Sequence, residues 1–325
     1  MNKEPEVSDI NKAHELIKKY AHHTPVLTSE SLNKITSAEL YFKCENFQKV
    51  GAFKIRGGIN SVFSLSEENV KKGVATHSSG NFAQALALTA KLKEVPAYIV
   101  MPRTAPQIKK NAVEGYGAKI YECEPTQQAR EELLNRVVAE TGAVFIHPYN
   151  DYDVIAGQAT AAKELIEDTE KLDIIISPVG GGGLISGTAL SAHYYSPGTK
   201  VIGAEPSGAD DAYRSLRDNK IYTSINPSTF CDGLLTSLGN KTFPIVKKYV
   251  NEIITVSDNI TLNAMRLIYE RMKIVVEPSA AITLAIVLNN PDKFKNKKIG
   301  LILSGGNVDL DNFKWGDYDK GGNIK

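Results

Sequence analysis

Short apolar segments alternate with longer segments of helical periodicity along most of this 325-residue chain. Apolar runs bounded by turn-forming residues are typical of buried strands, and apolar positions three and four apart are typical of helices. The pattern predicts strands at 74–76, 97–101, 119–122, 143–146, 174–179, 200–205, 253–256 and 298–303. It predicts helices at 83–90, 105–114, 127–140 and 184–195, and a first helix capped by Ser8 and Asp9. This order of elements predicts an α/β fold with parallel sheets.

The predicted elements form two groups, and this grouping predicts two lobes. Residues 67–149 contain a compact series of strands and helices, and the elements before and after them form a second series. We therefore predict a small α/β lobe at 67–149, inserted into a larger lobe made of 1–66 and 150–325, with a cleft between them. A length of 325 residues accommodates two lobes of about 150 residues each. The tail at 315–325 is rich in Gly, Asp and Lys and is predicted to be loosely ordered.

Composition and charge exclude several classes of protein. Apolar residues make up 42% and charged residues 23% of the chain, as in soluble globular proteins. The net charge of +1 indicates no nucleic-acid or membrane partner. The charged N-terminus has no signal-peptide pattern, and no apolar run is long enough to span a bilayer. The three cysteines are far apart and predict neither a disulfide framework nor a zinc site, so we expect a cytoplasmic protein.

Four consecutive glycines, Gly180 to Gly183, separate a predicted strand from a predicted helix. Residues without side chains let successive N–H groups converge at a helix N-terminus, where the helix dipole also favours an anion. The alternative is a flexible surface loop. The chain lacks the G-x-x-x-x-G-K-[ST] pattern and a G-x-G-x-x-G in its first strand–helix unit. The run is therefore interpreted as a cradle for one small phosphate, such as that of pyridoxal phosphate.

Lys54 lies between Phe53 and Ile55, which predicts an amine removed from water. Desolvation disfavours the ammonium form, lowers its pKa and makes the amine a nucleophile. The alternative is a surface lysine at the edge of a strand or helix. The glycine run favours the first interpretation, because pyridoxal phosphate requires both a phosphate site and a lysine that binds it covalently.

Four motifs occur in the order seen in fold type II pyridoxal-phosphate enzymes, the tryptophan synthase β-like fold. They are Phe53-Lys54-Ile55-Arg56-Gly57, Ser78-Ser79-Gly80-Asn81, the glycine run and Ser304-Gly305-Gly306-Asn307. Within that fold the chain resembles the serine racemase and short serine/threonine dehydratase family from about residue 10 to 310. The resemblance implies two parallel-sheet α/β lobes with the cofactor in the cleft between them.

The resemblance also assigns cofactor roles to particular residues. It implies that Lys54 holds pyridoxal phosphate beside Phe53 and serves as the base on one face of the substrate. Asn81 would hydrogen-bond the cofactor's phenolic oxygen, and Ser304 would meet its pyridine nitrogen. The phosphate would be held by Gly180, Gly181, Gly182, Gly183 and the Leu184 backbone. A hydroxyl partner leaves the ring a weaker electron sink than a carboxylate does, which suits racemisation and β-elimination. The alternative for Ser304 is a cap of the glycine turn.

Ser79 distinguishes relatives within the family. Dehydratases often carry Ala two positions before the asparagine, whereas serine racemases carry Ser. A hydroxyl on the face opposite Lys54 would supply the second acid/base that racemisation needs. The alternative is a turn or N-cap residue. For the substrate, the family match offers Ser78, Ser79, Asn81, Arg130 and Thr236.

Arg130 could bind a second carboxylate of the substrate as a bidentate pair. The alternative is an exposed helix arginine. The chain departs from the family at two places: Phe82 stands where the relatives usually carry His, and Tyr149 where racemases commonly carry Asn.

A second constellation of oxygen ligands follows the predicted strand at 200–205. Its two carboxylates, six positions apart around a turn, form a set suited to Mg²⁺ or Ca²⁺. The alternative is an acidic loop that binds no metal. The resemblance to serine racemases assigns Glu205, Asp211 and the Ala209 carbonyl as ligands.

The sequence thus predicts a pyridoxal-phosphate enzyme that interconverts L- and D-serine and also eliminates water from serine or threonine to give a keto acid and ammonia. The alternative is a dedicated L-serine/L-threonine or 3-hydroxyaspartate ammonia-lyase. Cysteine synthases share the fold but usually carry Thr-Ser-Gly-Asn-Thr where this chain has Ser78-Ser79-Gly80-Asn81-Phe82. A non-catalytic binding protein would have no need for Lys54. The resemblance also implies a homodimer and a nucleotide effector.

Overall fold

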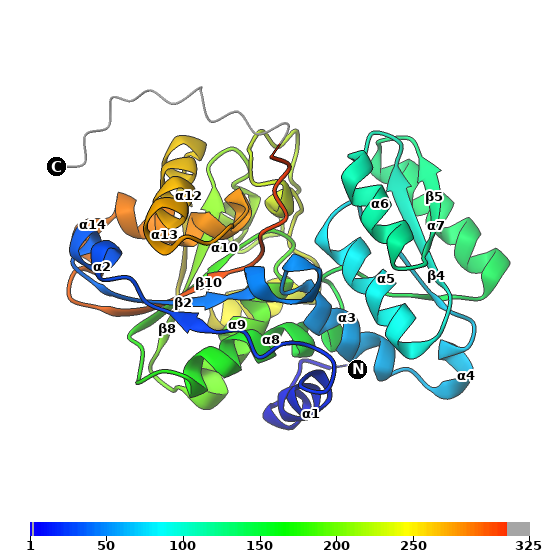
Figure 1. Cartoon of the computed structure of the whole chain (residues 1–325), viewed down its shortest axis with the longest axis horizontal. Coiled ribbons are helices and arrows are strands. Elements are labelled where there is room, and N and C mark those ends of the chain that lie inside the picture. The colour runs from blue at the N-terminus through cyan, green and yellow to red at the C-terminus, as the bar shows by residue number, and fades with distance from the viewer. Residues whose placement is uncertain (2, 311–325) are drawn as a thin grey trace.

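The computed structural model describes residues 1 and 3–310. The strands in this part of the chain form two separate sheets (Figure 1). The larger sheet has the order β1-β2-β10-β7-β8-β9 and the smaller sheet the order β5-β4-β3-β6. The strands of the larger sheet are β1 (Val26–Leu27), β2 (Glu39–Cys44), β7 (Ile174–Pro178), β8 (Lys200–Pro206), β9 (Glu252–Val256) and β10 (Lys298–Leu303). Those of the smaller sheet are β3 (Val74–His77), β4 (Ala97–Pro102), β5 (Lys119–Cys123) and β6 (Val144–Phe145). Neighbouring strands are parallel except β1, which is antiparallel to β2.

Helices connect the strands and cover both sheets. Those before β7 are α1 (Val7–Ile17), α2 (Glu30–Thr36), α3 (Lys54–Phe63), α4 (Glu67–Val70), α5 (Asn81–Lys93), α6 (Gln107–Gly115), α7 (Gln127–Thr141) and α8 (Tyr152–Glu167). Those after it are α9 (Gly183–Tyr195), α10 (Asp211–Asp218), α11 (Thr242–Tyr249), α12 (Asp258–Met272), α13 (Pro278–Asn289) and α14 (Pro291–Phe294). Three short 3₁₀ turns are η1 (Glu45–Phe47), η2 (Lys49–Gly51) and η3 (Asp232–Leu234).

All eight strands predicted from the apolar pattern are present, with ends that differ by at most two residues. The pattern missed β1 and β2. Charged Lys43 occupies a fully buried position on β2, so this strand does not read as an apolar run. The cap predicted for the first helix was also wrong. The N-cap is Glu6, and Asp9 is the third helical residue, whose carboxylate accepts the Glu6 backbone N–H at 3.0 Å.

The central strands of the smaller sheet, β3 and β4, are buried on both faces because they carry apolar side chains at consecutive positions. On β4, Ile99 and Met101 pack with α5 and α6, whereas Val100 between them packs with α7 on the other face. This arrangement follows from the alternation of side chains along a strand. The same apolar cluster includes Val62 and Val154, which lie outside 67–149. The lobe boundaries at 67 and 149 therefore stay a prediction.

The larger sheet is likewise enclosed between two helical layers. One face packs against α12 and α13, and the other against α8 and α9, which Figure 1 shows on opposite sides of the sheet. On β7, Ile176 faces the first layer and Ile175 faces the second. Helix α3 packs between the sheets, where Ile55 and Ile59 contact α1 and Ala85 of α5. The residue that begins α3 is thus held between the two halves of the molecule.

Helices α3 and α8 approach so closely that their contact requires glycine. A Cβ on Gly157 would lie 2.6 Å from the Arg56 carbonyl oxygen and 2.7 Å from the Cα of Gly57. Arg56, at this contact, is fully buried and binds Glu45 and Glu164. The backbone contact and the buried charges together fix the start of α3.

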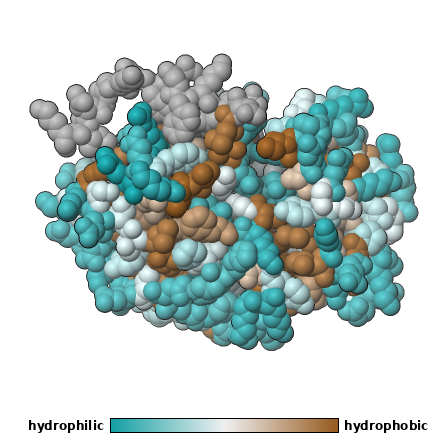
Figure 2. All heavy atoms as spheres, in the orientation of Figure 1, coloured by the Kyte–Doolittle hydropathy of each residue, from teal (hydrophilic) through white to brown (hydrophobic). Residues whose placement is uncertain are grey.

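Hydrophilic side chains cover the two ends of the molecule in Figure 2, and hydrophobic side chains gather over its middle. The large apolar residues that are most exposed include Phe47, Ile108, Ile225, Phe230 and Val275. No helix in the described part of the chain is both long and apolar enough to cross a membrane. The predicted loose tail at 315–325 lies outside the described residues.

Candidate active site

A cavity of about 730 Å³ lies between the two sheets, and the sequence motifs converge on it. The cavity is lined by every residue predicted to bind cofactor or substrate: Phe53, Lys54, Ser78, Ser79, Asn81, Arg130, Gly180, Gly181, Gly182, Gly183, Leu184, Thr236 and Ser304. The Ser78–Asn81, glycine and Ser304 segments follow the carboxyl ends of β3, β7 and β10. Ligands of open α/β sheets bind at the carboxyl ends of the strands, which explains why segments distant in sequence meet here.

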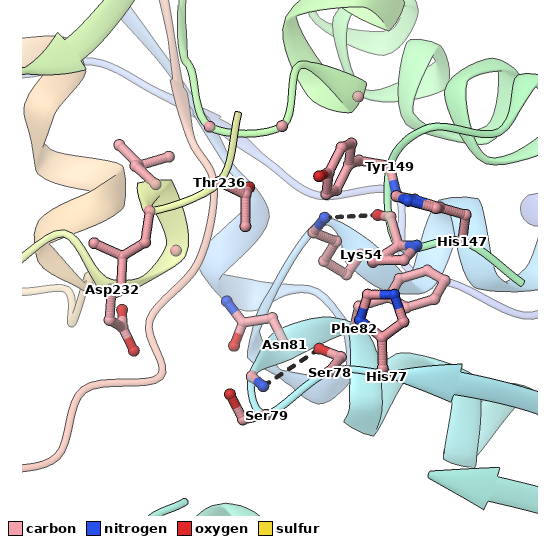
Figure 3. A pocket seen from close by; sticks show the side chains of 18 of the residues that line it. Lys54, His77, Ser78, Ser79, Asn81, Phe82, His147, Tyr149, Asp232 and Thr236 are labelled. Carbon is pink, nitrogen blue, oxygen red and sulfur yellow. Dashed lines mark hydrogen bonds between the residues drawn. The ribbon is translucent and has the colours of Figure 1, made fainter. Parts of the chain in front are cut away.

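Lys54 is the first residue of α3, and its side chain reaches into the cavity (Figure 3). Its Nζ donates a hydrogen bond to the Pro148 carbonyl oxygen at 2.9 Å. The amine also lies 5.1 Å from the ring centroid of Phe53 and 5.6 Å from that of Phe82. Burial lowers the pKa of Lys54 from 10.5 to about 8, although the Glu277 carboxylate acts in the opposite direction. The surface-lysine alternative is therefore wrong.

The segment that carries Lys54 is fixed to the end of β10. The Phe53 N–H donates to the Ser304 carbonyl oxygen at 3.0 Å, and Ala52 pairs with Gly305 in an antiparallel bridge. Ser304 is only 3% exposed, and its side chain lines the cavity. One strand end thus positions both the lysine segment and a hydroxyl group at the same cavity.

The glycine run forms the N-terminal turn of α9. Gly181 to Gly183 are buried, so the flexible-loop alternative is wrong. Gly182 is the N-cap and has a φ of +88°, a conformation that glycine adopts without strain. The Thr242 hydroxyl donates to the Gly181 carbonyl oxygen at 2.9 Å, which orients the loop. The first N–H groups of α9 have no partner within the helix, and Gly183 and Leu184, which carry two of them, line the cavity.

Tyr149 packs beneath this loop and explains one departure from the family pattern. A Cβ on Gly181 would lie 2.5 Å from atoms of the Tyr149 ring, and one on Gly183 would lie 3.0 Å from the Tyr149 Cβ. Burial raises the pKa of the Tyr149 phenol, so it stays protonated at neutral pH. Figure 3 shows Tyr149 close to Lys54 on one side of the cavity, with Thr236 nearby. The aromatic ring therefore supports the glycine loop.

Asn81 begins α5, and its amide is held by two residues of the larger lobe. Its Nδ2 donates to the two Glu277 carboxylate oxygens at 3.0 and 3.2 Å, and its Oδ1 accepts from Asn307 Nδ2 at 2.9 Å. Burial, together with the Asp232 carboxylate, raises the pKa of Glu277. These contacts fix the orientation of the Asn81 amide at the cavity.

Ser78 and Ser79 form the turn between β3 and α5. The Ser78 hydroxyl accepts the Gly80 N–H at 3.4 Å. Ser79 is half-buried and lines the cavity. The N-cap alternative for Ser79 is wrong, because α5 is capped by Gly80 without a side-chain hydrogen bond. In Figure 3, Ser79 and Lys54 are well separated, and Ser78 and Asn81 lie between them.

Two histidines line the same cavity and were not predicted. His147 Nδ1 accepts the backbone N–H groups of Tyr149 and Asn150 at 3.3 and 3.0 Å, which shapes the loop whose carbonyl binds Lys54. Burial lowers the pKa of His147 to about 3 and also lowers that of His77. Both rings are neutral at pH 7, so neither competes with Lys54 for a proton.

Arg130 lies on α7 at the edge of the cavity. It is half-buried, so the exposed-arginine alternative is wrong. Its Nε is buried and has no hydrogen-bond partner among the described residues. A buried guanidinium N–H without an acceptor is costly, and an anionic ligand would remove that cost.

One ion pair crosses the cavity between the two lobes. Lys109 of α6 lies 2.6 Å from Asp232, the first residue of η3. The next residue packs against the glycine loop, since a Cβ on Gly180 would lie 3.0 Å from the Gly233 carbonyl oxygen. The pair therefore ties the smaller lobe to the segment that supports the glycine loop.

The predicted metal ligands lie between the end of β8, which carries Glu205, and the start of α10 at Asp211, outside the cavity. Glu205 and Asp211 are buried, and burial raises their pKa values to about 8 and about 6. Glu205 accepts the N–H groups of Ala212 and Tyr213 at 2.7 Å each. Asp211 Oδ2 is buried and accepts no hydrogen bond within the described residues. An orphaned carboxylate oxygen beside a second acid and the buried Ala209 fits an oxygen-liganded cation.

The cavity contains the groups that pyridoxal phosphate requires. A desolvated lysine amine, a glycine-rich helix N-terminus and a buried hydroxyl at the end of β10 line one space. A Cβ at Gly181 would collide with the Tyr149 ring, so the loop can pack closely on this ring only because position 181 is glycine. Fold and site together define a two-lobed α/β enzyme that binds a phosphorylated carbonyl cofactor through a lysine.

Comparison with known proteins identifies the family. A family model described as pyridoxal-phosphate dependent enzyme matches residues 17–305, and the chain belongs to this family. It is 52% identical to a β-hydroxyaspartate dehydratase of Paracoccus denitrificans over 96% of this chain and 99% of the relative. It is 50% identical to a serine racemase of Dictyostelium discoideum over 94% and 95% of the two chains. The structure of maize serine racemase superposes with a TM-score of 0.93 at 46% identity, covering 95% of each chain.

Proposed function

We propose that this enzyme racemises serine and also eliminates water from it, giving pyruvate and ammonia. The observation that carries the proposal is the placement of the Lys54 amine and the Ser79 hydroxyl at one cavity. Lys54 begins α3 after β2, and Ser79 follows β3 of the other sheet. Two proton-transfer groups from opposite lobes can reach opposite faces of a substrate bound between them.

Pyridoxal phosphate held at this cavity would supply an electron sink, which makes the Cα hydrogen of the substrate more acidic. Lys54 then acts as a base at Cα, because its pKa of about 8 leaves a useful fraction of neutral amine near pH 7. The Pro148 carbonyl holds the Lys54 amine by its hydrogen bond, and the Phe53 and Phe82 rings limit its access to water. The lysine is thus both positioned and desolvated for proton transfer.

The Ser78–Asn81 turn would hold the substrate. Its hydroxyl groups and the N-terminus of α5 offer donors for the α-carboxylate, and the 13-residue helix adds a favourable dipole. Ser79 would return a proton to the face opposite Lys54, which inverts Cα. Loss of the β-hydroxyl needs only the Lys54 side, so elimination and racemisation share the first step.

A second candidate is a 3-hydroxyaspartate ammonia-lyase. The unpartnered Nε of Arg130 favours it, since a second substrate carboxylate would give this N–H an acceptor. The 52% identity to a β-hydroxyaspartate dehydratase supports the same substrate class. An Arg130→Lys variant should lose about 1.5–3 kcal/mol of transition-state binding for 3-hydroxyaspartate and little for serine. Equal losses for both substrates would argue against the second carboxylate.

The two candidates are separated by incubating the cofactor-loaded enzyme with L-serine and with threo-3-hydroxyaspartate. Chiral amino-acid analysis measures D-serine, and keto-acid assays measure elimination. Formation of both D-serine and pyruvate from L-serine supports the racemase. Elimination from either substrate without any D-serine supports the ammonia-lyase, and the absence of all products would overturn both.

Glu205, Asp211 and the Ala209 carbonyl are proposed as a Mg²⁺ or Ca²⁺ site, supported by the orphaned Asp211 oxygen. Binding to the native state should raise the melting temperature, and Asp211→Ala should remove that response. An unchanged melting temperature of the wild type after chelation would exclude the site. A homodimer and a nucleotide effector stay predictions from the resemblance, and a cytoplasmic location stays a prediction from the cysteine pattern. The exposed apolar side chains of Figure 2 are compatible with an assembly interface.

A further inference from the structure

Two histidines and a glutamate converge at a place remote from the cavity. His14 lies on α1, His23 in the loop that follows α1, and Glu164 on α8. One ligand atom from each residue lies within 4.8 Å of the other two. None of the three lines the active-site cavity. The function proposed above therefore does not explain this cluster.

The hydrogen bond of His23 determines which of its nitrogens faces the cluster. Its Nε2 lies 2.7 Å from Asp168 Oδ2, so Nε2 carries the hydrogen that the carboxylate accepts. The other nitrogen, Nδ1, lies 3.9 Å from Glu164 Oε2. In the neutral ring this nitrogen has a free lone pair directed at an ionised carboxylate. A carboxylate that orients a histidine through its outer N–H is a recurring feature of metal sites.

His14 presents a second lone pair from the helix side. Its Nε2 lies 3.8 Å from Glu164 Oε1, a separation too long for a hydrogen bond. Burial lowers the pKa of His14, which favours the neutral ring. Ligand bonds of about 2.0–2.2 Å place neighbouring donors of a tetrahedral ion roughly 3.3 Å apart. The three ligand atoms lie within 4.8 Å of one another, so a closure of up to roughly 1.5 Å would bring them to this spacing.

The charges around the cluster leave room for a cation. Glu164 binds Arg56 and Lys43, each at 2.7 Å, and Lys43 also lies 3.6 Å from Asp168. With Glu45, which pairs with Arg56, and the Lys163–Glu167 pair near His14, the group holds four carboxylates against three cations. One negative charge therefore remains beside the two imidazoles.

We propose that His14, His23 and Glu164 form a binding site for a divalent transition-metal ion of the zinc class, with Asp168 orienting His23. Two imidazoles and one carboxylate with an open fourth position suit Zn²⁺, Ni²⁺ or Cu²⁺, whereas Mg²⁺ and Ca²⁺ prefer oxygen ligands. The ion would join the loop after α1 to α8, whose Glu164 also anchors Arg56 two residues from Lys54. The site uses no cysteine, so the cysteine spacing gave no sign of it.

The test uses untagged, cofactor-loaded enzyme that has been dialysed against a chelator and titrated with Zn²⁺ by calorimetry. The wild type should bind one Zn²⁺ per chain at this site and gain thermal stability. His23→Ala should abolish this binding event, and the adjacent exposed His22→Ala is the matched control that should retain it. Asp168→Asn should weaken binding by about 10- to 100-fold, the usual effect of removing a group that orients a metal-bound histidine.

Because His23 is exposed, the His23→Ala variant should fold as the wild type does. A change at Glu164 would instead also remove a partner of Arg56. A Glu205→Ala variant distinguishes Zn²⁺ binding at this site from binding at the acidic loop, and it should bind Zn²⁺ here as the wild type does. Zn²⁺ binding that is the same in His23→Ala as in the wild type, or no binding by the wild type, would overturn the proposal.

Discussion

Removing the Arg56 guanidinium should destabilise the enzyme far more than a surface change would. Arg56 is fully buried and donates five hydrogen bonds. Two reach Glu45 at 2.7 and 2.8 Å, two reach Glu164 at 2.7 Å each, and one reaches Thr160 at 3.1 Å. Arg56→Met keeps most of the volume but leaves both carboxylates buried without this partner.

The loss of stability caused by Arg56→Met depends on which carboxylates lose their ion-pair partner. Glu164 retains Lys43 at 2.7 Å, whereas Glu45 loses the guanidinium and keeps a hydrogen bond from the Thr24 hydroxyl. Breaking a buried ion pair by removing one partner costs about 3–5 kcal/mol. At about 2 °C per kcal/mol, the value for larger domains, the melting temperature should fall by roughly 6–10 °C. The start of α3 should also loosen, so Lys54 should bind the cofactor less tightly.

The assay is a double-mutant cycle with Arg56→Met, Glu45→Gln and the double variant, followed by calorimetry and denaturant unfolding. Neutralising Glu45 removes the uncompensated charge, so the double variant should lose less stability than the sum of the single variants. A coupling of about 0.5–3 kcal/mol is expected for residues in direct contact. Additive losses, within about 0.5 kcal/mol, would refute the assignment of this pair as the anchor of α3.

Three further predictions concern the cofactor site. Lys54→Ala should abolish turnover of L-serine and the visible absorbance of bound cofactor, and retention of both would contradict the role of Lys54. Covalent binding of pyridoxal phosphate to the apoenzyme should accelerate as the pH rises through about 8, because the neutral Lys54 amine forms there instead of near 10.5. Rapid-mixing absorbance measures this rate, and a midpoint near pH 10.5 would contradict the prediction. Gly181→Ala places a Cβ 2.5 Å from the Tyr149 ring and should cost about 1–3 kcal/mol of cofactor binding by titration. Gly115→Ala, which meets no atom within 4 Å, is its control and should bind normally.

The sequence predicted the two sheets and the residues of the cavity because both depend on local signals. The central strand of the smaller sheet, β4, is an apolar run, and Ser78–Asn81, the glycine run and Ser304 each come soon after the end of a strand. Their convergence then follows from the parallel order of the strands. The roles that the resemblance gives to Ser79 and Ser304 stay predictions, as do those of Arg130 and Thr236.

The residues that the sequence missed act through contacts that carry no local signal. Glu277 precedes a proline at the start of α13 and reads as a helix cap, yet its side chain holds Asn81. Lys43 is a charge inside a strand, and it was missed because its partner Glu164 lies more than a hundred residues away. Position in sequence cannot reveal such pairs without the three-dimensional arrangement.

The most direct test of the proposed reaction is the ratio of D-serine to pyruvate that Ser79→Ala forms from L-serine. Ser79 would supply the proton on the face opposite Lys54, and a general acid/base contributes about 10²- to 10⁴-fold in rate. Chiral amino-acid analysis and a pyruvate assay on the same reaction measure both products. The account predicts that D-serine formation falls by at least about 100-fold while pyruvate formation is largely retained. An unchanged ratio of the two products would contradict it.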